Sequence, residues 1–185
     1  ARYTNLSPLA ALGLGVLGLA AAGYSQWLLD GTLLYQPFLD QLVISWSLCL
    51  IAAVGIALLF SVRRAKKMGE AIWIEPIKRG LTHFLMIALF GGILTAVLCN
   101  YLLFFLIPAV WMLCYGTGLY VVSSYSIKEF STLGLVFFAL GTIAAFLPLI
   151  NFIMLMLTFG AGHGVLALVI YRKYSEQNIR PQERR

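Results

Sequence analysis

Long apolar runs alternate with short polar interruptions along the whole chain. A helix needs about 20 mostly apolar residues to cross a bilayer, and the runs are of that order. The predicted transmembrane helices cover residues 9–28, 41–62, 81–107, 109–126, 130–147 and 149–171. We therefore predict an all-α, polytopic membrane bundle of six transmembrane helices, which forms a single domain over residues 1–173.

Proline and capping residues set several of the predicted helix ends. Ser7 and Pro8 form a helix start, because the hydroxyl can cap the helix and proline is tolerated at the first helical position. The apolar stretch over residues 81–125 is too long for one span, so we place a turn near Ile107 and Pro108. Pro148 ends the fifth predicted helix.

Two stretches outside the predicted helices are rich in charge. Residues 70–77 hold an apolar core between Glu70 and Glu75, which predicts a short segment lying in the membrane interface. Residues 174–185 have little apolar content, and we predict that they form a cytoplasmic tail.

The composition indicates a membrane protein and excludes a soluble domain. Hydrophobic residues make up 61% of the chain and charged residues 11%, whereas soluble domains have about 45–50% and about 25%. A soluble protein could not cover so much apolar surface with so few charges. No basic run alternates with aromatic residues, so we expect the lipid bilayer and no nucleic acid as a partner.

The basic residues all fall on one side of the predicted topology. When residues 63–80 are placed in the cytoplasm, all 13 Lys and Arg residues lie on that side, and Asp30 and Asp40 lie opposite. Loops rich in Lys and Arg stay cytoplasmic, so we predict that both termini are cytoplasmic. The expected location is a bacterial cytoplasmic (inner) membrane, with the first helix retained rather than cleaved as a signal peptide.

One ionisable residue lies deep in an apolar run. His163 stands within Gly160–Gly164, ~12 Å from the cytoplasmic end of the last predicted helix at a rise of about 1.5 Å per residue. Ionisable groups inside a membrane are costly and tend to mark function. Glycines of other predicted helices lie at a similar depth. Because glycine has no side chain, this layer can form either close backbone packing or a cavity. The candidate ligand-binding residues are His163, Gly91, Gly92, Gly118, Gly160, Gly164 and Tyr115.

Haem is an alternative ligand, because the chain has two histidines, His83 and His163. Two imidazoles on neighbouring helices can supply both axial ligands of a b-type haem. The helical rise places His163 ~10 Å deeper than His83. A single haem would therefore need a shift or tilt of one helix.

Other chemistry lacks a motif in this sequence. The three cysteines, Cys49, Cys99 and Cys114, have no metal-ligand spacing. The seven acidic residues all lie in loops, interfaces or the tail, so no buried carboxylate supports proton coupling. No Ser or Cys has a histidine at a recognisable catalytic spacing. We therefore expect a protein that is not an enzyme.

The first predicted helix carries a face of small residues. Ala11, Gly15, Gly18 and Ala22 follow spacings of four, three and four, which lets another helix approach closely. The face predicts helix packing, and it also suits self-association or docking on a membrane protein partner.

Two stretches resemble uncharacterised bacterial multi-pass membrane proteins: residues 111–116, and the run from Gly160 and His163 to residues 171–174. That resemblance implies no activity. The size and span count are also similar to the substrate-binding subunits of energy-coupling-factor vitamin transporters, which is a likeness of architecture alone.

These observations lead to one expected function and two alternatives. We expect an integral membrane protein that binds a small apolar or amphipathic ligand, or that serves as a subunit of a membrane complex. The alternatives are a b-type haem protein that uses His163 and His83, and a six-helix transport component.

Overall fold

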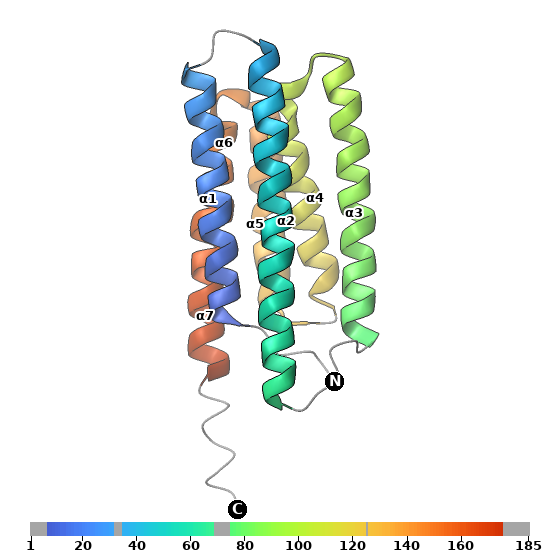
Figure 1. The fold of residues 1–185 in the computed structure, drawn as a ribbon, viewed down its shortest axis with the longest axis vertical. Helices are drawn as coiled ribbons and strands as arrows, with labels where there is room; N and C mark the ends of the chain where they lie inside the picture. The colour runs from blue at the N-terminus through green and yellow to red at the C-terminus, as the bar shows by residue number, and fades with distance from the viewer. Residues whose placement is uncertain (1–6, 32–34, 69–74, 125, 176–185) are drawn as a thin grey trace, which may run out of the picture. The chain divides into compact units, whose positions relative to one another are not determined.

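The computed structural model describes residues 7–31, 35–68, 75–124 and 126–175, which are almost entirely helical and contain no strand (Figure 1). The elements are α1 (Pro8–Gly31), α2 (Tyr35–Met68), α3 (Glu75–Asn100), η1 (Phe104–Leu106), α4 (Ile107–Val122), α5 (Glu129–Phe146), η2 (Pro148–Ile150), α6 (Asn151–Leu155), η3 (Met156–Gly162) and α7 (His163–Ser175).

Within the part of the chain that the structure describes, six segments are long and apolar enough to cross a membrane. They are Pro8–Leu28, Asp40–Phe60, Lys78–Asn100, Phe104–Val122, Glu129–Phe146 and Asn151–Arg172. The prediction of an all-α chain with six membrane-spanning helices is confirmed, because these helices have the length and the apolar composition that a membrane requires.

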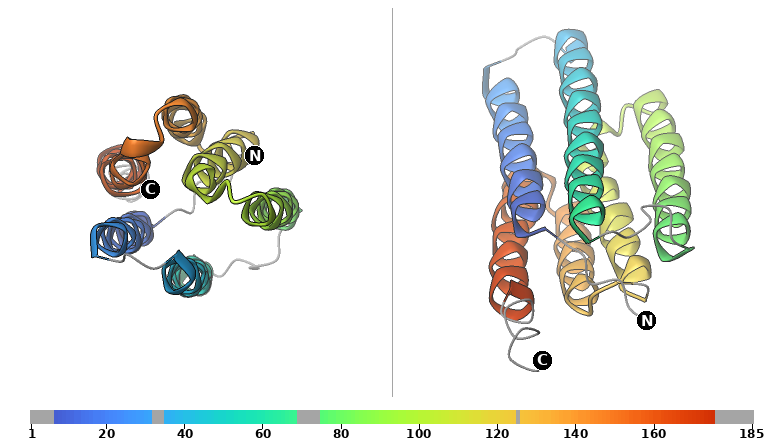
Figure 2. Two further views of the ribbon diagram at one scale, coloured as in Figure 1. Left: turned by 90° about the horizontal axis from the view of Figure 1, so that it is seen from above. Right: turned by 60° about the horizontal axis from the view of Figure 1, so that its bottom comes forward.

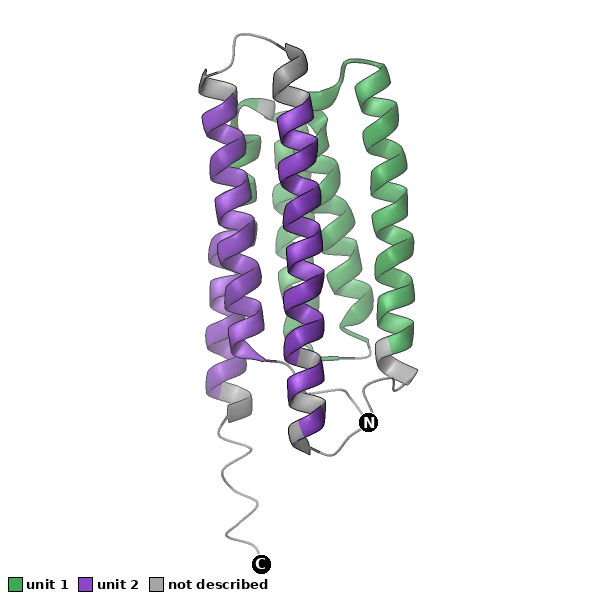
Figure 3. Cartoon of the chain, in the orientation of Figure 1, with its two compact units in different colours: residues 1–3, 73–158 green, residues 4–72, 159–185 purple. Residues whose placement is uncertain are grey.

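The chain divides into two compact units, shown in Figure 3. Unit 1 comprises residues 1–3 and 73–158, and unit 2 comprises residues 4–72 and 159–185. The division falls within η3, so the last membrane-spanning segment contributes to both units.

In unit 2, α1 lies between α2 and α7 (Figure 2). The small face predicted on α1 is buried, and Ala22 has no exposed surface. A Cβ atom added to Gly18 would lie 2.5 Å from the Cβ of Phe159. Glycine is needed there, because a side chain would collide with residues next to α7.

In unit 1, α4 lies between α3 and α5 (Figure 2). Gly116 of α4 and Gly134 of α5 face each other. A Cβ added to Gly116 would lie 2.7 Å from the carbonyl oxygen of Gly134, and a Cβ on Gly134 would lie 2.6 Å from that of Gly116. These two glycines let the backbones of α4 and α5 approach closely.

The turn between the third and fourth spans lies at residues 101–103, earlier than the predicted position near Ile107 and Pro108, and the predicted end of the third helix at residue 107 is wrong. Helix α3 ends at Asn100 instead of residue 107. The N–H of Leu103 donates to Leu98 O at 2.8 Å, the N–H of Leu102 donates to Cys99 O, and Leu102 has a φ of 59°. This is a Schellman ending, which turns the chain earlier. Pro108 then falls in the first turn of α4, where proline is tolerated.

The last span is not one continuous α-helix over residues 149–171. A short α6 leads into η3, a π-helix, and α7 begins only at His163. A π-helix uses wider hydrogen-bonded turns, and such segments often occur at functional sites. Composition alone does not reveal a change of hydrogen-bond register, so the sequence could not predict this break.

Other boundaries also differ from the predicted ones. Helix α2 covers residues 35–68 rather than 41–62. The predicted interfacial segment over residues 70–77 falls partly outside the described residues, and residues 75–77 belong to α3. Residues 174 and 175 of the predicted tail continue α7, and residues 176–185 are outside the described part of the chain.

Candidate functional site

His163 is the first residue of α7, and its side chain is 1% exposed. Its Nδ1 lies 3.1 Å from Phe159 O, one turn earlier in the chain. A carbonyl oxygen can only accept a hydrogen bond, so Nδ1 carries the proton and donates it. In the neutral imidazole, Nε2 is then the nitrogen that bears the lone pair.

The histidine sits in a closely packed part of unit 2. Its ring is stacked on that of Phe159, with centroids 5.6 Å apart. A Cβ on Gly15 would lie 3.0 Å from the Cβ of His163, and a Cβ on Gly160 would lie 2.9 Å from Leu19 Cδ1. The geometry at Gly15 and Gly160 therefore favours close packing over a cavity.

Four of the predicted site residues, Gly91, Gly92, Gly118 and Tyr115, belong to unit 1. A Cβ on Gly91 would lie 3.3 Å from Cys114 Sγ, and one on Gly118 would lie 3.2 Å from the ring of Phe84. These two glycines serve the contact between α3 and α4. By contrast, Gly92 is exposed, and a Cβ there would meet nothing within 4 Å.

Tyr115 lies in an aromatic cluster of unit 1. Its ring centroid is 4.9 Å from that of Phe137 and 5.9 Å from that of Phe84. The three rings come from α3, α4 and α5 and join the three long helices of this unit. Packing of unit 1 is the role that these contacts support.

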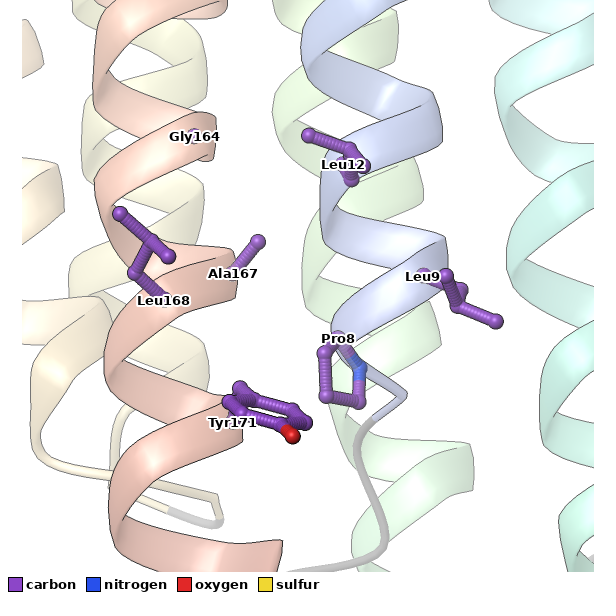
Figure 4. Close-up of a pocket in the computed structure, with 7 residues that line it drawn as sticks. All are labelled: Pro8, Leu9, Leu12, Gly164, Ala167, Leu168 and Tyr171. Atoms are coloured by element: carbon purple, nitrogen blue, oxygen red, sulfur yellow. The ribbon is translucent and has the colours of Figure 1, made fainter.

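An apolar groove lies between α1 and α7 in unit 2 (Figure 4). It has a volume of about 170 Å³. The residues that line this α1–α7 groove are Pro8, Leu9 and Leu12 from α1, and Gly164, Ala167, Leu168 and Tyr171 from α7. Every lining residue is apolar except Tyr171, whose hydroxyl is the one polar side-chain group in the wall.

Gly164 keeps this groove open. A Cβ built on Gly164 would meet nothing within 4 Å, unlike one on Gly15, Gly18 or Gly160. The position therefore has room for a side chain, and the space beside it belongs to the groove. Gly164 is the one predicted site residue that lines it.

Sequence reasoning missed the other six lining residues. Gly164, Ala167, Leu168 and Tyr171 have helical spacings of three, four and seven, which place them on one face of α7. That spacing was visible in the sequence. It did not distinguish this face as a binding surface, because the other faces of the same helix are also apolar.

The two histidines considered as haem ligands belong to different units. His83 is exposed on α3, with Nδ1 2.7 Å from Arg79 O. Among the described residues, no group of three or more His, Cys, Asp or Glu side chains could hold a metal ion. Haem binding stays a prediction, which Soret absorption by the purified protein tests.

The small face of α1 is occupied by residues of the same unit, because Gly15 and Gly18 pack against residues 159–163. Self-association or partner docking through Ala11, Gly15, Gly18 and Ala22 stays a prediction. Such an interaction would require the contacts of Gly15 and Gly18 with residues 159–163 to break.

Comparison of the chain with protein-family models, curated proteins and solved structures finds no match. The resemblance to bacterial multi-pass membrane proteins stays a prediction, as does the role of a subunit or transport component.

Proposed function

We propose that this chain is an integral membrane protein that binds one alkyl chain of an amphipathic lipid in the α1–α7 groove. The observation that carries the proposal is an open apolar groove, about 170 Å³ in volume, beside a glycine that has room for a side chain. A binding role of this kind needs no catalytic group.

The shape of the wall suits an alkyl chain. Leu9, Leu12 and Leu168 supply branched apolar contacts, and Gly164 leaves the space between them unfilled. In a membrane there is no hydrophobic drive between apolar surfaces, so binding depends on van der Waals packing. An empty groove would forfeit such contacts, whereas a methylene chain restores them.

The test uses a phosphatidylcholine that carries a photoreactive diazirine in its acyl chain. The protein is reconstituted with this lipid, irradiated, and the labelled residues are identified by mass spectrometry. We expect labelling to concentrate on Leu9, Leu12 and Leu168. The reference is Ile51 of α2, which is 68% exposed and therefore reports general contact with lipid.

Gly164→Leu is the decisive variant, because the new side chain fills the groove without meeting a neighbouring atom at its Cβ. We expect it to lower labelling of the groove to the level seen at Ile51. Gly55→Leu is the matched control, since Gly55 of α2 is exposed and equally open. Equal labelling of the groove and Ile51 in the unmodified protein, or no effect of Gly164→Leu, would refute the proposal.

A further inference from the structure

The face of α7 that forms the groove continues toward the end of the helix. Gly164, Leu168 and Arg172 follow one another in steps of four, and Tyr171 lies seven residues after Gly164. Residues seven apart share one face of an α-helix and residues four apart are neighbours on its surface, so Tyr171 lies on the face of Gly164, and Arg172 lies at the edge of that face, one turn beyond Leu168. The apolar wall therefore leads directly to a hydroxyl and a guanidinium.

Tyr171 stands at the mouth of the groove. Its side chain is 63% exposed, and Figure 4 shows its hydroxyl on the side of Pro8. Arg172 is also exposed. Tyrosine places its ring against apolar groups and its hydroxyl toward a polar medium, as at a membrane interface.

We infer that the ligand of the α1–α7 groove is an anionic phospholipid, whose phosphate is bound by Tyr171 and Arg172 while one acyl chain lies in the groove. This inference rests on the proposed function, because it assigns the headgroup of the lipid whose chain fills the groove. A guanidinium can donate two parallel hydrogen bonds to a phosphate, and the tyrosine hydroxyl can add a third.

Charge complementarity favours an anionic headgroup at this place. The chain carries a net charge of +6, and its basic residues gather at helix ends such as Arg63, Lys66 and Arg172. Basic residues beside a membrane attract anionic lipids. The end of α7 itself has the opposite effect, because a helix C-terminus bears a partial negative charge. Anion binding there therefore depends on Arg172.

The experiment is native mass spectrometry of the detergent-purified protein, titrated with phosphatidylglycerol and phosphatidylcholine that have identical acyl chains. We expect the unmodified protein to bind phosphatidylglycerol more tightly. An exposed ion pair contributes up to about 1 kcal/mol, so Arg172→Gln should weaken phosphatidylglycerol binding by up to about fivefold. It should weaken phosphatidylcholine binding less, because the choline cation partly neutralises the phosphate of that lipid.

Three further variants separate the contributions of the Tyr171 hydroxyl, of general charge attraction and of the groove to lipid affinity. Tyr171→Phe keeps the ring and removes the hydroxyl, so we expect weaker binding of both lipids, since each carries a phosphate that can accept this hydrogen bond. Lys66→Gln removes one exposed charge from α2, outside the groove, and should change neither affinity. Gly164→Leu should weaken the binding of both lipids, because it fills the space for their common chain.

The outcomes distinguish this inference from the proposed function. If Gly164→Leu weakens both lipids but the unmodified protein does not discriminate between them, the groove holds a chain and the headgroup assignment is wrong. An equal loss in Arg172→Gln and Lys66→Gln would indicate general attraction and also overturn it. If oleate binds and competes while phosphatidylglycerol does not bind, the ligand is a fatty acid instead. If Gly164→Leu has no effect on the binding of either lipid, the groove is not the binding site, and both the inference and the proposed function are wrong.

Discussion

The indole Nε1 of Trp46 donates a hydrogen bond of 3.0 Å to Ser25 Oγ, and this bond joins α2 to α1. Ser25 is fully buried, and its hydroxyl donates in turn to Ala21 O at 2.7 Å. A hydroxyl can accept one hydrogen bond while it donates another, so both polar side chains are satisfied in apolar surroundings.

Unit 1 repeats this arrangement between its first two long helices. Trp111 Nε1 of α4 donates to Thr95 Oγ1 of α3 at 3.0 Å, and Thr95 donates to Gly91 O at 2.8 Å. In both units a tryptophan of the second helix binds a hydroxyl that is bonded to its own helix. An unsatisfied indole N–H within a membrane is costly, so each of these hydrogen bonds stabilises the packing of its two helices.

The Trp46–Ser25 pair should show a measurable coupling free energy. We expect a double-mutant cycle of Trp46→Phe and Ser25→Ala to give about 0.6 kcal/mol, and no more than about 1.7 kcal/mol, as for other membrane-helix hydrogen bonds. Denaturant unfolding in detergent measures the four stabilities. Thr117→Ala is the control, since Thr117 donates to Leu113 O within α4 of unit 1 and shares no partner with Trp46, so its cycle with Trp46→Phe should be additive.

Gly18→Ala should destabilise the protein. The new Cβ would lie 2.5 Å from the Cβ of Phe159, so α1 and the residues beside α7 must move apart. Overpacking of this kind costs about 1–3 kcal/mol, which thermal unfolding in detergent can measure.

Gly23→Ala is the matched control for Gly18→Ala, because it lies on the same helix and its Cβ would meet nothing within 4 Å. It should be neutral or stabilising by up to about 1 kcal/mol, since alanine is the better helix former. Equal loss of stability in the two variants would contradict close packing at Gly18.

Leu102→Gly should stabilise unit 1. Leu102 has a φ of 59°, in the left-handed region that glycine adopts without strain, and its side chain is 65% exposed. The substitution should relieve about 1–2 kcal/mol of backbone strain. It should also cost about 0.5–1 kcal/mol, because glycine has more conformational freedom in the unfolded chain. The expected net gain in the free energy of unfolding is about 0.5–1 kcal/mol. Leu103 has a φ of −96°, so Leu103→Gly should bring no gain in the same unfolding measurement.

The six spans could be predicted from the sequence because a bilayer imposes length and composition directly on each apolar run. Helix starts were predictable where local chemistry decides, as at Pro8. The end of α3 was not, because Leu102 occupies a position where glycine is usual. The π-helical segment before His163 also left no trace in composition.

The candidate site could be predicted only in part. Gly164 was singled out with its neighbours, but nothing in the sequence separated it from Gly160, whose added Cβ would collide with Leu19. The difference depends on which face of the helix meets α1. In a soluble protein polar residues would mark the outer face, whereas here Leu168 on the groove and Leu157 on exposed surface have the same chemistry.

The orientation of the chain can be determined with single cysteines on described, exposed residues. After Cys49, Cys99 and Cys114 are replaced, Lys128→Cys should react with a membrane-impermeant maleimide from the cytoplasmic side alone, because Lys and Arg stay on that side. Asn100→Cys at the end of α3 should react from the opposite side alone. The reverse pattern would place Tyr171 and Arg172 outside the cytoplasm and break the positive-inside rule. Labelling of both positions from one side would mean that α4 does not cross the membrane.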